Sequence, residues 1–379
     1  MEKEYKISVL YKIVYGIFIT IIFGFAVFLT SEGLKKHHST SNYISGVLAF
    51  VIGAVWTLYL KMKRVIIAED AVEVISLFGS CKVYADGIKG FRVMDKLLII
   101  YLINGERKKL RIYGPQLMDK SEEMIAQLSN LCPDLDTVEY QQEMGLILND
   151  NALGYSENER NEKLESAKRK ALIFNIGGGV LFVGCFFRNY GFIVCLMTFF
   201  YPLIGIFLII SGKGLIKFFT KNNSPLPSVY VGMYIPSMVL LIVTIIDYHI
   251  INHSDVWVPF LLISSVLIIV ISIKGITKKG GAAQFVILLV IALFYGYGST
   301  LMINCGFDQS APQIFDATVV DKYKTKDVPY VKISDWGSYK ESGEIKILNS
   351  FYEQVQIGST IKVNSKRGGL NIPWYYIPQ

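Results

Sequence analysis

Residues 256–273 read VWVPFLLISSVLIIVISI and contain no Asp, Glu, Lys or Arg. A helix rises 1.5 Å per residue, so a stretch of this length reaches about 27 Å, close to the thickness of the hydrocarbon core of a bilayer. An uncharged apolar block of this kind predicts a transmembrane helix and not the half-polar helix of a globular domain.

Six further stretches share this pattern: residues 13–30, 43–60, 171–187, 191–210, 228–246 and 283–303. The sequence therefore predicts a polytopic α-helical membrane protein with about seven transmembrane helices, two in residues 1–60 and five in 171–303, and a lipid bilayer as its surroundings. Residues 171–187 contain Asn175 and three glycines at 177–179, which we interpret as close helix packing. If 171–187 and 191–210 did not cross the membrane, five spans would remain and both soluble regions would stay on the same sides.

The basic residues are divided unevenly between the loops. Only Lys35, Lys36 and Arg188 fall in the short loops on one side, whereas the other side holds Lys3, Lys6, Lys12, Lys61, Lys63, Arg64, Lys168, Arg169, Lys170, Lys213, Lys217, Lys221, Lys274, Lys278 and Lys279. Because short cytoplasmic loops carry the excess of Lys and Arg, we expect a multi-pass protein of a bacterial inner (plasma) membrane with a cytoplasmic N-terminus and an extracytoplasmic C-terminus.

Residues 61–150 change to short runs rich in Val, Ile and Tyr. Strands are predicted near residues 64–68, 72–78, 82–84, 88–94, 96–103 and 107–113, with Asn104-Gly105 as a hairpin turn. Apolar residues between Met118 and Leu131 then recur at helical spacing. We expect a cytoplasmic β-roll plus helix. Residues 151–170 are predicted as a charged helical linker that starts with a capping box of Ser156 and Glu159.

This order of strands and helix, over about residues 64–136, resembles the pleckstrin-homology-like (PH-like) domains of many bacterial membrane proteins. The resemblance implies a strongly bent sheet closed by a C-terminal helix. Eukaryotic members often bind lipid head groups, and no residues here match a motif that would transfer that activity. Arg107, Lys109 and Arg111 do share one face of a predicted strand, which leaves two interpretations: lipid head-group contact, or a solvated edge strand.

Residues 304–379 form a second β-rich region. Strands are predicted near residues 315–323, 329–333, 344–348, 360–364 and 372–377, with Gly368-Gly369 as the last turn. We expect an extracytoplasmic small β-barrel or sandwich that leans on the membrane or on a partner because its core is small. Trp374, Tyr375 and Tyr376 fill this core or lie in the membrane interface.

The stretch 247–255, DYHIINHSD, holds the one candidate metal site. His249 and His253 are four residues apart, and a helix would bring them together beside Asp247 and Asp255. His37 and His38 are expected in another loop on the same side. The alternative is a short loop that is polar for solvation alone.

Charge and motifs narrow the function. The net charge of +7 gathers at the membrane face, which removes the argument for a nucleic-acid partner. The sequence contains no P-loop, GxSxG or HExxH motif, and its predicted spans contain no ionisable Asp, Glu, Lys or Arg.

We therefore expect a non-enzymatic sensor, scaffold or accessory subunit that needs no cofactor and acts through a protein partner or homo-oligomer. The alternative is a transporter or channel component with a path between helices four to seven, lined by Ser237, Thr244, Ser264, Ser265, Ser272, Tyr295 and Tyr297. A third class, an outer-face metalloenzyme, depends on the histidines.

Overall fold

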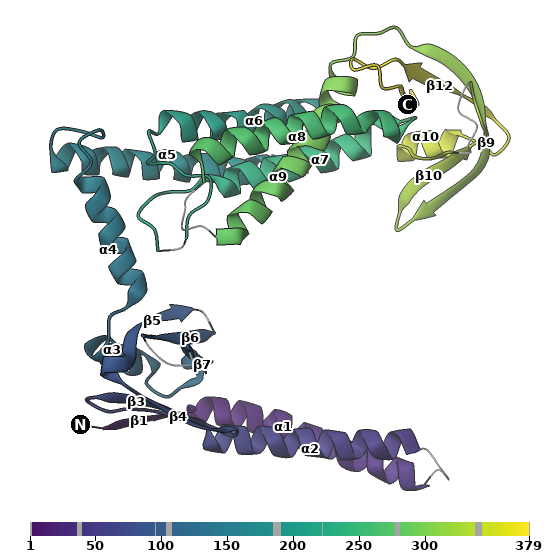
Figure 1. Cartoon of the computed structure of the whole chain (residues 1–379). Coiled ribbons are helices and arrows are strands. Elements are labelled where there is room, and N and C mark those ends of the chain that lie inside the picture. The colour runs from purple at the N-terminus through teal and green to yellow at the C-terminus, as the bar shows by residue number, and fades with distance from the viewer. Residues whose placement is uncertain are drawn as a thin grey trace. The chain divides into compact units, whose positions relative to one another are not determined.

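The computed structural model describes residues 2–35, 40–94, 96–103, 108–184, 191–221, 223–276, 281–337 and 343–378. The chain divides into two compact units, Met1–Glu143 and Met144–Gln379 (Figure 1). Six of the described helices are long and apolar enough to cross a membrane: α1 (Val9–Lys35), α2 (Thr40–Met62), α6 (Gly191–Ser211), α7 (Tyr230–Asp247), α8 (Trp257–Lys274) and α9 (Gly281–Leu301). The chain is thus a helical membrane protein with β-rich parts, as the sequence predicted.

The first unit contains two antiparallel sheets followed by helix. One sheet has the order β1 (Lys3–Lys6), β2 (Arg64–Ile67), β3 (Ala71–Ser76), β4 (Gly79–Tyr84), and the other β5 (Ile88–Met94), β6 (Leu97–Leu102), β7 (Lys109–Tyr113). Helix α3 (Ser121–Leu131) follows, and α4 (Leu135–Leu148) leads into the second unit. Val65, Phe91, Ile100 and Leu128 share one core, so both sheets and α3 form a single packed body. The predicted Asn104-Gly105 turn lies outside the described residues.

Strand β1 is absent from the sequence prediction, which assigned residues 1–60 to two helices. In the chain β1 precedes the α1–α2 hairpin and β2 follows it, and the two strands pair antiparallel with Tyr5 opposite Val65. The hydroxyl of Tyr5 donates to Gln127 Oε1 at 2.8 Å, and Lys3 Nζ lies 2.7 Å from Glu123 Oε1, so both side chains bind α3. The helical hairpin is therefore an insertion between two neighbouring strands of one sheet.

The second unit starts with α5 (Glu157–Gly184), a helix whose first half is charged and whose second half is apolar. Residues 157–170 of the predicted linker and 171–184 of the predicted span thus lie in one helix. One half of the capping box is confirmed, because Ser156 Oγ accepts from the Glu159 amide at 3.2 Å. The other half differs: Glu159 Oε2 accepts at 2.8 Å from the amide of Tyr155, one residue before Ser156.

Helix α5 packs closely on α7. A Cβ added to Gly178 would lie 2.9 Å from the Cα of Gly232, so the two backbones are in contact. Asn175 donates to the Ser228 carbonyl and accepts from the Gly232 amide, both at 2.8 Å. The polar residue and the glycines of 171–187 therefore join two helices, as the close-packing interpretation expected.

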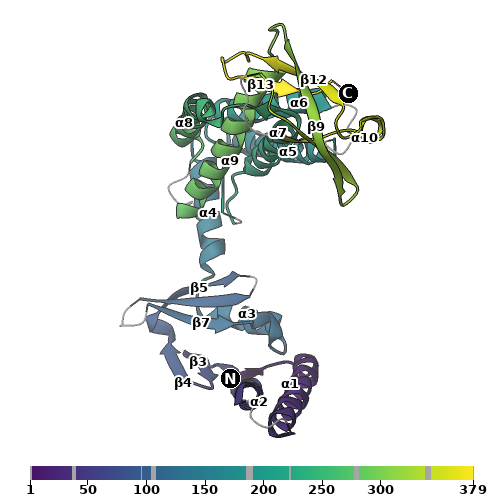
Figure 2. The same cartoon turned by 90° about the vertical axis from the view of Figure 1, so that its right-hand side faces the viewer.

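Residues 313–376, together with two residues from between α7 and α8, form one six-stranded antiparallel sheet (Figure 2). Its order is β11 (Gly343–Lys346), β10 (Val328–Ile333), β9 (Gln313–Thr325), β12 (Thr360–Lys366), β13 (Trp374–Tyr376), β8 (His249–Ile250), and α10 (Asn349–Gln354) lies between β11 and β12 in the chain. The predicted β region at 304–379 is present. Trp374 and Tyr375 are buried, so they fill the core of the junction and the sheet.

Candidate functional site: the junction between helices and sheet

The connection between α7 and α8 is built into the sheet. It was predicted as a loop, but His249 pairs with Tyr375 and Ile250 with Trp374 in an antiparallel register. Ile250 and Trp374 also pack with Phe260 of α8 and Leu301 of α9 in one small apolar core. The membrane helices and the sheet therefore share both backbone hydrogen bonds and a core.

Asn304 makes the second connection, from the end of α9. It lies in a π-helical turn, Met302–Gly306, and is fully buried. Its Nδ2 donates to the Ile372 carbonyl at 2.8 Å, while its Oδ1 accepts from the amides of Leu370 at 3.0 Å and Ile372 at 3.3 Å. One side chain thus satisfies three backbone groups of the segment that precedes β13.

Gly368 is required for this contact. It has a φ of 81°, and a Cβ there would lie 2.4 Å from Asn304 Oδ1. The neighbouring Gly369 amide donates to the Asn304 carbonyl at 2.8 Å. The Gly368-Gly369 pair, predicted as a turn, is therefore the place where the returning chain lies directly against the helix end.

Asp308 holds the same segment from outside the helix. Its carboxylate accepts from Trp374 Nε1 at 2.8 Å, from the Gly368 amide at 3.1 Å and from the Ser310 amide at 2.8 Å, and Lys366 Nζ lies 4.0 Å away. Burial opposes ionisation of this side chain, but the hydrogen bonds outweigh it and hold the pKa of Asp308 below its ordinary value. A charged carboxylate therefore joins the end of α9 to β12 and β13.

The predicted metal residues do not assemble into one cluster. His249 lies in β8, whereas His253 begins a short 3₁₀ helix (His253–Val256) with its Nδ1 3.4 Å from the Tyr297 hydroxyl. Asp255 accepts from Asn252 Nδ2 within that turn. Within the described ranges, no group of three or more His, Cys, Asp or Glu is placed to hold a metal ion. His37 and His38 lie outside those ranges, and the metal hypothesis stays untested.

Two of the predicted lipid-contact residues, Lys109 and Arg111, lie in the first unit on edge strand β7. Lys109 and Arg111 are exposed on one face, while Leu110 and Ile112 are buried on the other, and Arg107 lies outside the described residues. Lys109 Nζ lies 5.1 Å from the centroid of the Tyr101 ring. The expected basic face exists; lipid contact there stays a prediction.

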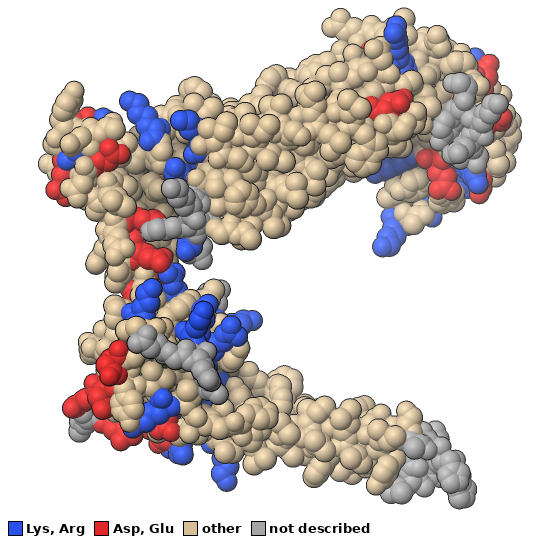
Figure 3. Space-filling model, in the orientation of Figure 1, with Lys and Arg blue, Asp and Glu red and all other residues tan. Residues whose placement is uncertain are grey.

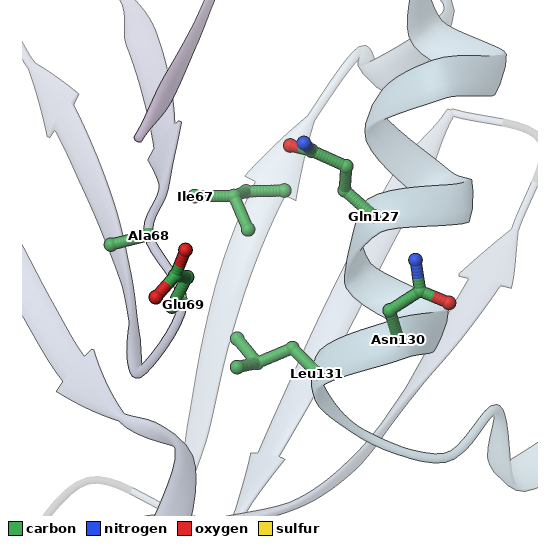
Figure 4. A pocket seen from close by; sticks show the side chains of 6 residues that line it. All are labelled: Ile67, Ala68, Glu69, Gln127, Asn130 and Leu131. Atoms are coloured by element: carbon green, nitrogen blue, oxygen red, sulfur yellow. The ribbon is translucent and has the colours of Figure 1, made fainter. Parts of the chain in front are cut away.

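A small pocket of the same unit lies between the β2–β3 turn and α3 (Figure 4). Its volume is about 210 Å³, and its polar groups are Glu69, Gln127 and Asn130. Gln127 already accepts from the Tyr5 hydroxyl. One carboxylate and two amides offer no positive charge to a phosphate, so this pocket does not add to the basic face.

Four of the polar residues that were predicted to line a path donate hydrogen bonds within the helix bundle. The hydroxyls of Ser237 and Thr244 donate to carbonyls one turn earlier in α7, and Ser264 donates from α8 to the Ala292 carbonyl of α9 at 2.9 Å. Tyr295 donates to the Phe199 carbonyl at 3.0 Å. Ser264 and Tyr295 thus connect helices, whereas Ser237 and Thr244 bond within α7, and all four side chains are buried. The predicted path between helices four to seven stays a prediction.

The chain matches no known protein family, no curated protein and no solved structure. The contacts above are therefore the basis for assigning a role. Sequence reasoning missed Asn304 and Asp308 because each is a single polar residue at the end of an apolar segment. The one signal for them was Gly368-Gly369, which marks a place where two backbones approach closely.

Proposed function

We propose that this protein is a non-enzymatic sensor, scaffold or accessory subunit of the bacterial inner membrane, which couples a cytoplasmic module to an extracytoplasmic β domain through protein contacts. One observation carries the proposal: the sheet is joined to the helices at both β8 and Asn304. A tethered domain would need only its covalent connection. Two additional attachments transmit a displacement of the sheet to α7, α8 and α9.

The proposed topology places seven crossings in the membrane, with α5 as the third. Support comes from the two ends of its apolar half. Gly178 packs on Gly232 near the start of α7, and a Cβ on Gly184 would lie 4.0 Å from Val194 near the start of α6. Since α6 has the length and hydropathy of a span and runs back from that end, α5 has to reach the same end. Seven crossings would place the two termini on opposite sides of the membrane, and the excess of Lys and Arg in the loops on one side supports a cytoplasmic N-terminus and an extracytoplasmic C-terminus.

The cytoplasmic module is proposed to be PH-like. Its four-stranded and three-stranded antiparallel sheets share a core with the helix that follows them, which agrees with the bent sheet and closing helix that the resemblance implies. Such a module presents an edge strand, β7, and a charged face to other proteins. A protein partner or a second copy of the chain is the expected ligand.

Crosslinking in native membranes followed by quantitative pull-down tests this proposal. The wild type is expected to retain a partner in a fixed ratio, and Asn304→Ala is expected to lower that ratio, because it uncouples the sheet from α9. Gln356→Ala, at an exposed position of the same domain, is the control. A partner that is absent in every sample, together with ion flux through liposomes that contain only the purified protein, would replace this proposal with the channel alternative.

A reporter enzyme fused after Gln379 tests the topology separately. Activity is expected only outside the cytoplasm. Activity confined to the cytosol would overturn the proposed sidedness but would leave the junction contacts as they are.

A further inference from the structure

A cavity of about 480 Å³ opens in the second unit where α6 ends. It lies between the charged half of α5 and the segment that follows α6. Three lysines and several apolar side chains line it, among them Lys163, Lys170, Lys213, Phe207, Leu208 and Leu215. The described lining contains no Asp or Glu, so it combines positive charge with apolar surface.

Two of the three lysines are available to an anion. Lys163 Nζ is already 2.6 Å from Glu159 Oε1. Lys170 and Lys213 have no ion-pair or side-chain hydrogen-bond partner within the described part of the chain, and both are exposed. Two cations without a counter-ion at one cavity attract a single negative group more strongly than either does alone.

The backbone places Lys213 at this cavity at an energetic cost. Lys213 has a φ of 47° and is followed by Gly214 with a φ of 89°. The left-handed region is disfavoured for a residue with a side chain, and such positions occur where the surrounding structure holds them. The turn ends α6, and it places Lys213 in the lining of the cavity that Lys170 also lines.

The cavity lies at the border between polar and lipid-facing surface. Lys170 immediately precedes the apolar half of α5, where Ile173 is 64% exposed, and Phe207 on α6 is 67% exposed. Figure 3 shows basic side chains at one end of the broad uncharged surface of α5–α9. Exposed apolar side chains of this kind face acyl chains, so the lysines lie at the level of the head groups.

We propose that this cavity binds the phosphate group of an anionic phospholipid from the adjoining leaflet. Lys170 and Lys213 neutralise the phosphate, and Phe207 packs against the first part of an acyl chain. A lipid in this position would contact both α5 and α6, because residues of both helices line the cavity. The two lysines favour an anionic lipid over an uncharged or zwitterionic one, and the apolar lining favours a lipid over a free anion.

Native mass spectrometry of the full-length detergent-solubilised protein tests the proposal. The probes are phosphatidylglycerol and phosphatidylcholine with identical acyl chains. The wild type is expected to retain phosphatidylglycerol preferentially, and Lys170→Gln/Lys213→Gln is expected to weaken that retention roughly tenfold or more. Lys168→Gln/Lys274→Gln removes the same charge outside the cavity lining and is expected to keep the preference.

Two further arms distinguish the source of the phosphate and protect against a folding artefact. Phe207→Ala is expected to weaken phosphatidylglycerol retention, and inorganic phosphate is expected not to compete at equal concentration. Thermal unfolding in the same detergent identifies any variant that has lost its fold. If the double variant Lys170→Gln/Lys213→Gln has done so, the single variant Lys213→Gln is measured in its place. Equal losses in both lysine pairs, full competition by inorganic phosphate, or no preference in the wild type would each overturn the proposal.

Discussion

The imidazole of His249 stacks on the ring of Tyr375, with the two ring centroids 5.3 Å apart and the ring planes inclined by 29°. The same two residues are partners in the β8–β13 register. His249, which lies between helices α7 and α8, is thus held against Tyr375, which lies close to the end of the described chain. The stack and the strand pairing together make the short connection between α7 and α8 the edge of a sheet.

Burial lowers the pKa of His249 below its ordinary value of 6.5. Below that pH the unfolded chain binds a proton that the folded chain does not, so the free energy of unfolding is expected to fall as the pH decreases from about 6.5 until the folded pKa is reached. Thermal unfolding between about pH 8 and pH 5 measures this slope. His249→Phe is expected to reduce it, and His253→Gln serves as the comparison. An unchanged slope in His249→Phe would show that this pH dependence does not come from His249.

Asn304→Ala is expected to destabilise the junction by about 2–4 kcal/mol, because it leaves one carbonyl and two amides without their partner in a buried site. Hydrogen exchange of residues 368–376 is expected to increase more than that of β9 and β10. Gln356→Ala in the same domain should change neither. Uniform exchange across the whole sheet would show that Asn304 is not a local attachment.

Gly178→Ala and Gly179→Ala form a matched pair at adjacent helical positions. A Cβ at 178 meets the Gly232 backbone at 2.9 Å, whereas a Cβ at 179 has nothing within 4 Å. Gly178→Ala is expected to lower the melting temperature because α5 and α7 have to separate, and Gly179→Ala to leave it unchanged or raise it slightly through better helix propensity. Thermal unfolding in detergent measures both. Equal effects would argue against close α5–α7 packing.

Tyr5→Ala is expected to destabilise the first unit by about 3–5 kcal/mol, because it empties a site that is 3% exposed in the shared core. Tyr5→Phe removes only the hydrogen bond to Gln127 and is expected to cost about 1 kcal/mol. Limited proteolysis between α2 and α3 reports the loss. If Tyr5→Ala were as resistant as the wild type, β1 would not be part of the folded sheet.

Local signals in the sequence were sufficient for the six helices that are long and apolar enough to cross a membrane and for most strands, whereas the predicted seventh span, 171–187, is not among those six. The bilayer acts as a solvent on each segment separately, so an uncharged block such as 256–273 predicts α8 without reference to the rest of the chain. The hydrogen bond from the Glu159 amide to Ser156 could also be predicted, because both partners lie within one turn. The same holds for the alternating residues of β7.

Strands β1 and β8 and the Asn304 contact could not be predicted this way. Four and two residues are too short to carry a strand pattern, and each becomes a strand only because an unpaired edge, β2 or β13, lies beside it. Asn304 joins the helix to the sheet only because the fold brings Ile372, which is distant in sequence, within hydrogen-bond distance of it. Hydropathy is a local property, so the sequence alone was enough to identify which segments are apolar and long enough to cross a membrane. Hydrogen bonds between distant segments depend on where the fold brings those segments together, so only the three-dimensional structure could show how the sheet joins the helices.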